Sequence, residues 1–564
     1  METPRLLENS KWAATTASVW IQCVAGASYT FSIYSPALKA SQGYDQSTLD
    51  TVSVFKDIGA NAGVLSGVLY AAVTAESRNR RRSAIGRFGG PWVVHAAGAV
   101  QCLVGYLFMW AAVTGVIRRP PVAAMCLFMF LAAHAQTFFN TANVVSGVQN
   151  FSGYSGTIVG IMKGFLGLSG AILVQVYDTL CKGKPSTFLL VLALLPTVIS
   201  ILLMPLVRIH ESSTGGEKKH LNSFSAVALI IVAYLMVIII LEIILTFSTW
   251  ASISSFVLLL LLLTSPLGIA IKAESEDSIY RTAETSSTES DPLLDNFYPT
   301  TSSKISSDKN PLDYEEQASS ADTQVKVTSG SDISPVEEVD INLFQAMRTV
   351  NFWLLFLAMI CGMGSGLATI NNMSQLGQSL GYTSQEITSF VSLWSIWNFL
   401  GRFGAGYLSD YFLHTRGWAR PSLMAVTLAT MTAGHIIIAS SFSGNLYLGS
   451  ILVGICYGSQ WSLMPTITSE LFGVTHMGTI FNTIAIASPV GSYIFSVRVI
   501  GYMYDKEASG NTCTGTHCFM LSFFVMASVA CFGCLVGIAL FFRTRRFYQS
   551  VVLRRLQYSS RQGT

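Results

Sequence analysis

The sequence predicts an all-α polytopic membrane protein with two related six-helix bundles and an inserted helix pair, about 14 spans in all. Three observations predict this fold class. Of the 564 residues, 51% are hydrophobic and only 12% are charged, whereas a soluble domain carries about 25% charged residues. Many apolar runs reach the length of about 20 residues that crosses a bilayer. Motifs from the first part of the chain also return, in the same order, in the second part.

Polar loops divide the apolar runs into membrane spans of about 20 residues each. The expected spans are 12–38, 47–75, 90–113, 121–146, 155–181, 186–208, 221–247, 251–272, 349–372, 386–410, 420–441, 444–468, 475–503 and 518–542. The segment after the eighth span is rich in Ser, Thr and acidic residues, and such a segment buries too little surface to fold. The expected organisation is therefore an N-terminal six-helix bundle (1–210), an inserted two-helix segment (211–272), a disordered acidic cytosolic loop (273–340), a C-terminal six-helix bundle (341–545) and a cytosolic tail (546–564).

An internal repeat supports the two halves. The matching motifs are Gly43-Tyr44 with Gly381-Tyr382, Gly63 with Gly401, Gly156-Thr157-Ile158 with Gly478-Thr479-Ile480, and Tyr177-Asp178 with Tyr504-Asp505. Because the inserted spans form a pair, both halves keep the same orientation in the membrane. Parallel repeats of this kind are typical of transporters that bind substrate at the midplane between the halves.

Lysines and arginines near the span ends predict the orientation. They cluster after the second, sixth, tenth and last spans as Arg78, Arg80, Arg81, Arg82 and Arg87, then Arg208, Lys218 and Lys219, then Arg416 and Arg420, then Arg543, Arg545, Arg546, Arg554 and Arg555. The rule places these loops, both termini and the acidic loop in the cytosol. Arg118, Arg119, Lys182 and Lys184 fall on the opposite side and do not fit it.

The stretch Gly401–Asp410, with the sequence GRFGAGYLSD, ends an apolar run and precedes a short basic loop. Its glycines allow a neighbouring helix to come close. Arg402 inside the helix and Asp410 at the membrane surface need partners, because an unpaired charge in hydrocarbon costs roughly 2.5–3.5 kcal/mol or more. We interpret both as gating residues. The first half has Ala71 where the second half has Asp410.

The pattern G-R-x-x-x-G-x-L-S-D followed by a basic loop resembles the signature between the second and third helices of a six-helix half in the major facilitator superfamily. Three further stretches resemble the plant nodulin-like family of that superfamily: residues 11–36, which include YTFSIYSP, residues 366–372 (GLATINN) and residues 491–496 (GSYIFS). The resemblance implies a plant membrane protein of the nuclear-fusion-defective type, more distantly similar to oxalate and monocarboxylate transporters. It implies an architecture rather than a particular cargo.

Ionisable residues inside spans are candidates for function. The candidate substrate-binding residues are Lys56, Asp57, Lys163, Asn371, Asn372 and Arg498. Each has a structural alternative: an ion pair with a neighbouring helix for Lys56 or Asp57, a side chain reaching the cytosolic surface for Lys163, a pair with Asp505 for Arg498, and interhelical hydrogen bonds for the asparagines. Neighbours in sequence point about 100° apart on a helix, so Lys56 and Asp57 are not expected to pair with each other.

Two other features lie outside the expected substrate path. Glu289, Leu293 and Leu294 fit an E-x-x-x-L-L sorting motif, as do Glu2, Leu6 and Leu7, and an adaptor complex recognises such peptides in flexible cytosolic segments. Chance occurrence of so short a pattern is the alternative. Cys513 and Cys518 lie in a polar loop on the non-cytosolic side, where they can form a disulfide.

These features together predict a secondary-active transporter of a small solute that works by alternating access. Because cations outnumber acids among the candidates, we hypothesise an organic anion as the solute, with a coupling proton carried by Asp57. The alternative is a non-transporting receptor or scaffold that retains the fold. No enzyme motif, cofactor site, metal site or nucleic-acid interface is predicted. The expected location is the vacuolar or plasma membrane.

Overall fold

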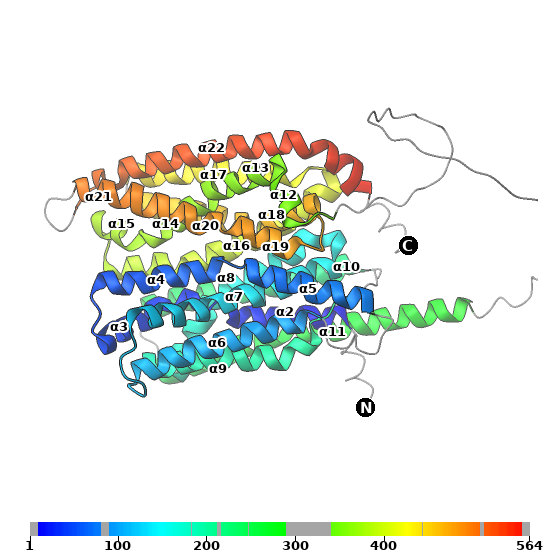
Figure 1. Ribbon diagram of the computed structural model, residues 1–564, viewed down its shortest axis with the longest axis horizontal. Helices are drawn as coiled ribbons and strands as arrows, with labels where there is room; N and C mark the ends of the chain where they lie inside the picture. The colour runs from blue at the N-terminus through cyan, green and yellow to red at the C-terminus, as the bar shows by residue number, and fades with distance from the viewer. Residues whose placement is uncertain are drawn as a thin grey trace, which may run out of the picture. The chain divides into compact units, whose positions relative to one another are not determined.

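The computed structural model is helical, with no strand in the residues that it describes: 10–80, 90–181, 183–210, 216–245, 248–288, 340–440, 442, 444–507 and 513–554 (Figure 1). The chain divides into two compact units, Glu276–Glu337 and the remainder. Within the second, larger unit, we call residues 10–210 the N-terminal segment and residues 340–554 the C-terminal segment. The sorting motifs at Glu2–Leu7 and Glu289–Leu294 lie outside the described residues.

The N-terminal segment begins with a helix that Ser10 caps, because the Ser10 hydroxyl accepts hydrogen bonds from the N–H groups of Trp12 and Ala13. The predicted first span is divided at Gly26, where a β-carbon would overlap the Ser169 hydroxyl of a neighbouring helix. The elements are α2 (Lys11–Ala25), η1 (Ala27–Thr30), α3 (Phe31–Gln42), α4 (Gln46–Asn61), α5 (Val64–Arg80), α6 (Pro91–Val113), α7 (Val122–Asn150), η3 (Ser152–Tyr154), α8 (Ser155–Leu180), α9 (Pro185–Leu203) and η4 (Met204–Leu206).

Two long helices follow, α10 (Glu217–Ile244) and α11 (Thr249–Thr288). Glu217 of α10 forms an ion pair with Lys11 at 2.5 Å, and the Trp20 indole of α2 donates a hydrogen bond to the Leu263 carbonyl of α11 at 2.6 Å. Both helices therefore pack on the N-terminal segment. The predicted boundary at residue 272 is too early, because α11 continues to Thr288. Residues 273–288 contain no glycine or proline that would end a helix.

The C-terminal segment, like the N-terminal segment, contains both long helices and spans that are divided into shorter helical elements. Its elements are α12 (Leu343–Met347), α13 (Val350–Met359), η5 (Ile360–Gly364), α14 (Ser365–Asn371), α15 (Met373–Ser379), α16 (Ser384–Arg416), α17 (Arg420–Ala439), α18 (Asn445–Phe472), α19 (Met477–Ala485), α20 (Ala487–Ser492), η6 (Tyr493–Gly501), α21 (Tyr502–Glu507), α22 (His517–Phe547) and η7 (Tyr548–Val552). Thr383 and Glu386 form a capping box that starts α16.

Eleven helical stretches of the described residues are long and apolar enough to cross a membrane. The predicted spans that are not among them correspond to α2 with α3, to α16 and to α18. The first is interrupted at η1, and α16 and α18 carry buried polar side chains, including Asn398, Arg402 and Gln460. These polar side chains face other helices rather than lipid, so they lower the hydropathy of α16 and α18 without exposing polar atoms.

The long helices of the larger unit lie roughly along one common axis, some running one way and some the other, so that the bundle has two ends (Figure 1). α15 and α21 lie at one end, which we call the disulfide end. The last turns of α5 and α22 lie at the other end (Figure 1). We call it the Arg420 end, because Arg420 contacts Glu470, which in turn contacts Tyr548 directly after α22.

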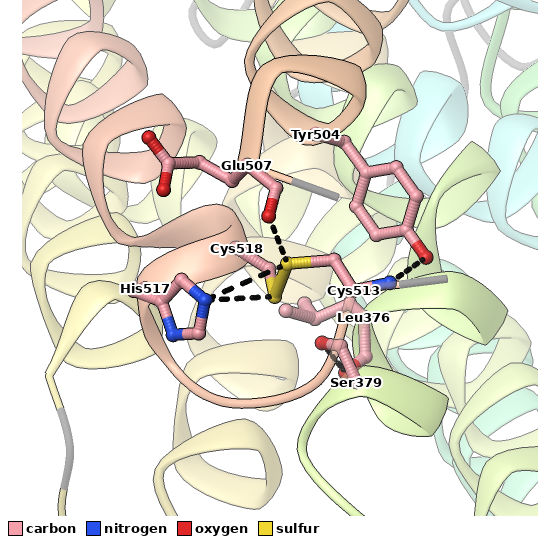
Figure 2. The surroundings of a disulfide bond; sticks show 7 residues. All are labelled: Leu376, Ser379, Tyr504, Glu507, Cys513, His517 and Cys518. Carbon is pink, nitrogen blue, oxygen red and sulfur yellow. Dashed lines mark hydrogen bonds between the residues drawn. A yellow bond between two sulfur atoms is a disulfide. The ribbon is translucent and has the colours of Figure 1, made fainter. Parts of the chain in front are cut away.

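A disulfide joins Cys513, in the loop before α22, to Cys518 in the first turn of α22. Figure 2 shows the loop against the end of α15, where the Gly515 N–H donates to the Ser379 carbonyl at 2.8 Å. The Cys513 N–H also donates to the Tyr504 hydroxyl at 3.1 Å (Figure 2). The crosslinked loop therefore holds α15, α21 and α22 together at this end.

Removing this crosslink with Cys513→Ser and Cys518→Ser is expected to lower the free energy of unfolding by about 2 kcal/mol, the loop-closure value for so short a loop. Thermal denaturation of the purified protein in detergent measures the change. The pair Cys531→Ser and Cys534→Ser is the matched control, because both of these cysteines of α22 are free. Equal melting temperatures for the two double variants would contradict the prediction.

Candidate functional site

The N-terminal and C-terminal segments meet where α8 crosses α16. Gly156 and Gly160 of α8 face Gly406 of α16 so closely that a β-carbon on Gly406 would overlap the Gly156 carbonyl oxygen and lie 2.8 Å from the α-carbon of Gly160. Small residues permit such approach between helices in a membrane. We call this contact the α8–α16 junction.

Asp410 of α16 caps the start of α8 across this junction. Its two carboxylate oxygens accept hydrogen bonds from the N–H groups of Gly156 at 3.0 Å and Thr157 at 2.5 Å. No side chain next to the start of α8 supplies this cap. A carboxylate at a helix N-terminus satisfies free N–H groups and interacts favourably with the helix dipole. Asp410 therefore joins the two segments by a charged interaction.

Arg420, the first residue of α17, holds the Asp410 side chain in place. Its guanidinium lies 2.6 Å from the Asp410 carboxylate and 2.7 Å from the Glu470 carboxylate. It also donates to the Ser409 hydroxyl and, at 3.3 Å, to the Ser155 hydroxyl of the other segment. Only 1% of the Arg420 side chain is exposed. The pair is therefore shielded from water, and its members depend on each other.

Glu470 of α18 extends the network to η7, because its second carboxylate oxygen accepts a hydrogen bond from the Tyr548 hydroxyl at 2.7 Å. One guanidinium therefore lies between two carboxylates. The α8 N-terminus and the tyrosine hydroxyl supply the additional donors that the second negative charge needs.

A second junction brings α5 of the N-terminal segment against α19 of the C-terminal segment. A β-carbon on Gly67 would overlap the backbone of Gly478. Beside this contact, the Asn482 amide donates to the Thr141 hydroxyl at 2.8 Å, and Thr141 in turn lies 2.7 Å from the Ser66 hydroxyl. This α5–α19 junction therefore uses neutral hydrogen bonds only within the described residues.

The two junctions connect the repeated motifs crosswise. Gly67 and Gly406 occupy corresponding places in the repeat, and so do Gly478 and Gly156. Gly67 packs on Gly478, while Gly406 packs on Gly156. Only the α8–α16 junction has a carboxylate at this place in the repeat. The α5–α19 junction lacks it, because the first half has Ala71 where the second half has Asp410.

Gly406→Val is expected to prevent the α8–α16 junction from closing, because its β-carbon would overlap the Gly156 carbonyl. Accessibility of an added cysteine beside the junction to a water-soluble thiol reagent should rise at least severalfold. Gly404→Val is the matched control, since nothing lies within 4 Å of a β-carbon there. Equal labelling of the two variants would show that the close contact does not control closure.

Lys163 lies on α8, inside the seam between the segments. Its side chain is 2% exposed, and its ammonium nitrogen lies 5.1 Å from the ring centroids of both Trp461 and Phe481. Among the described residues it has no carboxylate partner within ion-pair distance. The aromatic faces stabilise the cation in part, but its charge is not neutralised.

Arg402 of α16 lies beside Lys163 and is also buried. Its guanidinium donates to the Lys163 carbonyl at 2.9 Å and to the Asn398 amide oxygen at 2.8 Å. The guanidinium carbon lies 5.7 Å from the Trp461 ring. Arg402 too has no carboxylate partner in the described part of the chain. The arrangement thus places two basic side chains around one indole ring, and an anion between or beside them would favour the charged form of both.

α8 connects this cation pair to a more exposed region. A β-carbon on Gly167 would lie 3.3 Å from the Arg402 guanidinium, and one turn further on, a β-carbon on Gly170 would lie 3.1 Å from Tyr29. Tyr29 is 45% exposed. Tyr457 of α18 is near enough to Tyr29, Arg402 and Asp57 for electrostatic interaction.

Lys56 and Asp57 form an ion pair with each other at 3.1 Å, so the expectation that they do not pair is wrong. A lysine has a long, flexible side chain, and it can bend back to an adjacent carboxylate although the two Cα–Cβ bonds diverge. The side chains are 17% and 35% exposed. The Lys56 ammonium also lies 5.1 Å from the Phe31 ring.

Asn371, Asn372 and Arg498 have partners other than Lys163 and Arg402. Asn371 donates to the Ser492 hydroxyl at 3.3 Å and Asn372 to the Ser496 hydroxyl at 2.7 Å. These bonds join α14 to α20 and η6, which is the structural alternative for both asparagines. Arg498 is exposed on η6 and lies over the Tyr493 ring at 5.8 Å.

Known families account for most of the chain. The protein-family model described as Nodulin-like matches residues 11–271. The family model described as NFD4, C-terminal domain, matches residues 332–550. The chain belongs to the nodulin-like family of the major facilitator superfamily. The Nodulin-like match includes all of α10 and most of the apolar part of α11. These two helices therefore lie within the part of the chain that matches the family.

Nodulin-like relatives extend over nearly the whole chain. Protein NUCLEAR FUSION DEFECTIVE 4 of Arabidopsis thaliana is 24% identical over 95% of this chain and 89% of its own length. A shorter match links the family to transporters: the Yarrowia lipolytica protein named Probable transporter MCH1 is 25% identical over 31% of this chain and 38% of its own length. About a third of the nodulin-like chain is thus similar to a protein named as a probable transporter.

A solved structure shows the same fold. The proton:xylose symporter XylE, bound to 6-bromo-6-deoxy-D-glucose, superimposes with a TM-score of 0.52 at 10% identity and covers 95% of each chain. The nodulin-like protein therefore has the all-helical major facilitator fold.

Sequence reasoning did not identify several residues of the site. Arg420 was noted only as part of a basic loop, and Glu470 and Tyr548 were not noted. Arg420 follows Asp410 by ten residues, a spacing that the superfamily signature could have indicated. The sequence spacing of 50 residues between Arg420 and Glu470 carries no such signal.

Proposed function

We propose that this protein is a secondary-active transporter of a small organic anion that works by alternating access between its two segments. The observation that carries the proposal is the pair of buried cations, Lys163 and Arg402, which have no carboxylate partner among the described residues. Burying a charge without a counter-charge is costly. An anionic solute that binds there would supply the missing charge.

The junctions supply the moving part of this mechanism. Lys163 is on the N-terminal segment and Arg402 is on the C-terminal segment, so an anion that contacts both couples binding to the relative position of the two. In the structure the α8–α16 junction at the Arg420 end is closed by Asp410. Opening that junction must break the cap and its pair with Arg420. Asp410 and Arg420 therefore act as a gate, and Arg402 acts as gate and anion contact at once.

Several finer features belong to the same proposal. The transporter has about 14 spans, with α10 and α11 inserted between two six-helix bundles. Its termini face the cytosol, because the arginine-bearing last turns of α5 and α22 share the Arg420 end. It resides in the vacuolar or plasma membrane. Asp57, half-exposed and near Tyr457, binds a coupling proton, and its ion pair with Lys56 is broken and formed as the proton moves.

Reconstituted vesicles loaded with a mixed pool of metabolites test the function. The purified protein is expected to deplete or enrich one class of small organic anions in the vesicle lumen compared with protein-free vesicles. Movement of neutral or cationic solutes alone would contradict the anion assignment. No movement of any solute, by protein that retains its fold, would favour the alternative of a non-transporting receptor or scaffold.

A further inference from the structure

We propose that a pocket between α10 and α16 binds the phosphate headgroup of an anionic phospholipid. The pocket has a cavity volume of about 80 Å³ and lies beside the α8–α16 junction. Its walls come from the start of α8, the first turns of α10 and the last turns of α16. Basic pockets between membrane helices are suited to lipid headgroups.

The charge of the pocket favours an anion. Lys218 is exposed at its wall and forms no ion pair with any other described residue. Asp410 also reaches the wall, but its carboxylate is already engaged by Arg420 and by the start of α8. The neighbouring acid Glu217 is paired with Lys11 at 2.5 Å. The unneutralised charge that faces the pocket is therefore positive.

Polar side chains around Lys218 can supply the remaining hydrogen bonds. His414 is fixed by its Nδ1 atom, 2.7 Å from the Asp410 carbonyl, and by its ring, which stacks on Tyr154 at 5.1 Å. This leaves the Nε2 atom for a ligand. Asn222 and Tyr411 also line the pocket and offer an amide and a hydroxyl, groups that donate to phosphate oxygens.

The surface next to the pocket fits acyl chains, which distinguishes a lipid from a free phosphate compound. Asn222 is the first residue of an exposed stripe on α10 that continues through Ala226, Leu229, Ala233 and Val237. The spacing of three and four residues keeps these positions on one face of the helix. Leu229 is 42% exposed and Val237 is 50% exposed. A pocket with polar side chains at its wall that leads into an apolar stripe matches a headgroup with its chains.

The position of the pocket has a consequence for the gate. Thr157 belongs to the N-terminal segment and Asp410 to the C-terminal segment, and both lie at its wall. A headgroup that contacts both sides is expected to stabilise the closed junction, because the contacts on one side are lost when the segments separate. Lipid binding itself does not depend on which solute the protein carries.

Native mass spectrometry tests the site on the full-length protein in micelles that contain equimolar phosphatidylcholine and phosphatidylglycerol. We expect phosphatidylglycerol to be retained in preference, and Lys218→Ala to weaken its binding about fivefold, the factor that corresponds to roughly 1 kcal/mol for a lysine near an anionic headgroup. Lys219→Ala removes the same charge one residue away, outside the pocket lining, and is expected to change binding less than about twofold.

Three outcomes would overturn the proposal. Equal retention of the two lipids would show that the pocket does not select an anionic headgroup. Equal losses for Lys218→Ala and Lys219→Ala would show a general charge effect rather than a site. Displacement of phosphatidylglycerol by soluble glycerol phosphate at matched concentration would assign the pocket to a free phosphate compound. Asn222→Ala is a second variant that tests the pocket without a change of charge, and it is expected to weaken binding in the same direction.

Discussion

Arg420→Met is expected to lower the free energy of unfolding by about 3–5 kcal/mol, because breaking a buried ion pair leaves a charge without compensation. Here two carboxylates lose their partner at once, since the Arg420 guanidinium lies 2.6 Å from Asp410 and 2.7 Å from Glu470. Methionine keeps an unbranched apolar stem and introduces no new charge. Thermal denaturation of the purified protein in detergent gives the size of the loss.

Asp410→Asn is the informative companion to this variant. It removes one negative charge but leaves Arg420 paired with Glu470, and the amide oxygen can still accept one N–H from the start of α8. The expected loss is therefore smaller than that of Arg420→Met. The junction should nevertheless open more often, since the dipole of α8 favours a full negative charge. A larger loss for Asp410→Asn than for Arg420→Met would contradict the network as described.

Lys163→Met is expected to abolish uptake while leaving the protein as stable as before or more stable. Truncating one member of a buried charged contact costs about 2 kcal/mol or more, so uptake of the anion identified in the vesicle experiment should fall at least about 30-fold. The side chain is buried and unpaired among the described residues, so an apolar replacement of similar volume removes a desolvation cost.

The control for this prediction is Lys184→Met, which removes a positive charge from an exposed position before α9 and should leave uptake unchanged. Retained uptake by the Lys163→Met variant would contradict an anion-binding role for this lysine. A large loss of thermal stability would show instead that Lys163 has a structural partner that stabilises the fold. The opposite signs expected for activity and stability separate the two roles.

The sequence was sufficient for the helical architecture, because apolar runs of lipid length and the glycine motifs depend on local composition. The glycines of Gly401–Asp410 predicted a close approach by a neighbouring helix, since such approach requires small residues. That this helix is α8, with Gly156 and Gly160 at the contact, comes from the structure. Asp410 was identified as a residue that needs a partner because an unpaired charge is costly at that depth.

Other parts of the site could not be predicted from one sequence. Glu470 contacts Arg420, and Tyr548 contacts Glu470, only because tertiary packing brings the end of α18 and the start of η7 beside the start of α17. The Lys56–Asp57 pair was missed because helix geometry fixes the Cα–Cβ directions but not the end of a long side chain. The predicted span of α11 was too short because the apolar run ends at residue 272. The polar residues that follow are compatible with a helix, and α11 continues to Thr288.

The central claim is that the two segments rock about the seam that contains Lys163 and Arg402. Spin labels can follow both ends of the seam, with one pair at Ser152 and Thr415 near the α8–α16 junction and a second pair at Leu180 and Gln378 near the disulfide end. All four positions are exposed. Distances measured by pulsed electron paramagnetic resonance in lipid are expected to show two populations, in which one pair is short when the other is long.

Gly406→Val should shift both distributions in opposite directions, toward separation at Thr415 and approach at Gln378. The transported anion should change the same populations. If each pair instead shows a single distance that neither Gly406→Val nor the anion alters, the segments do not rock, and alternating access is not the mechanism of this protein.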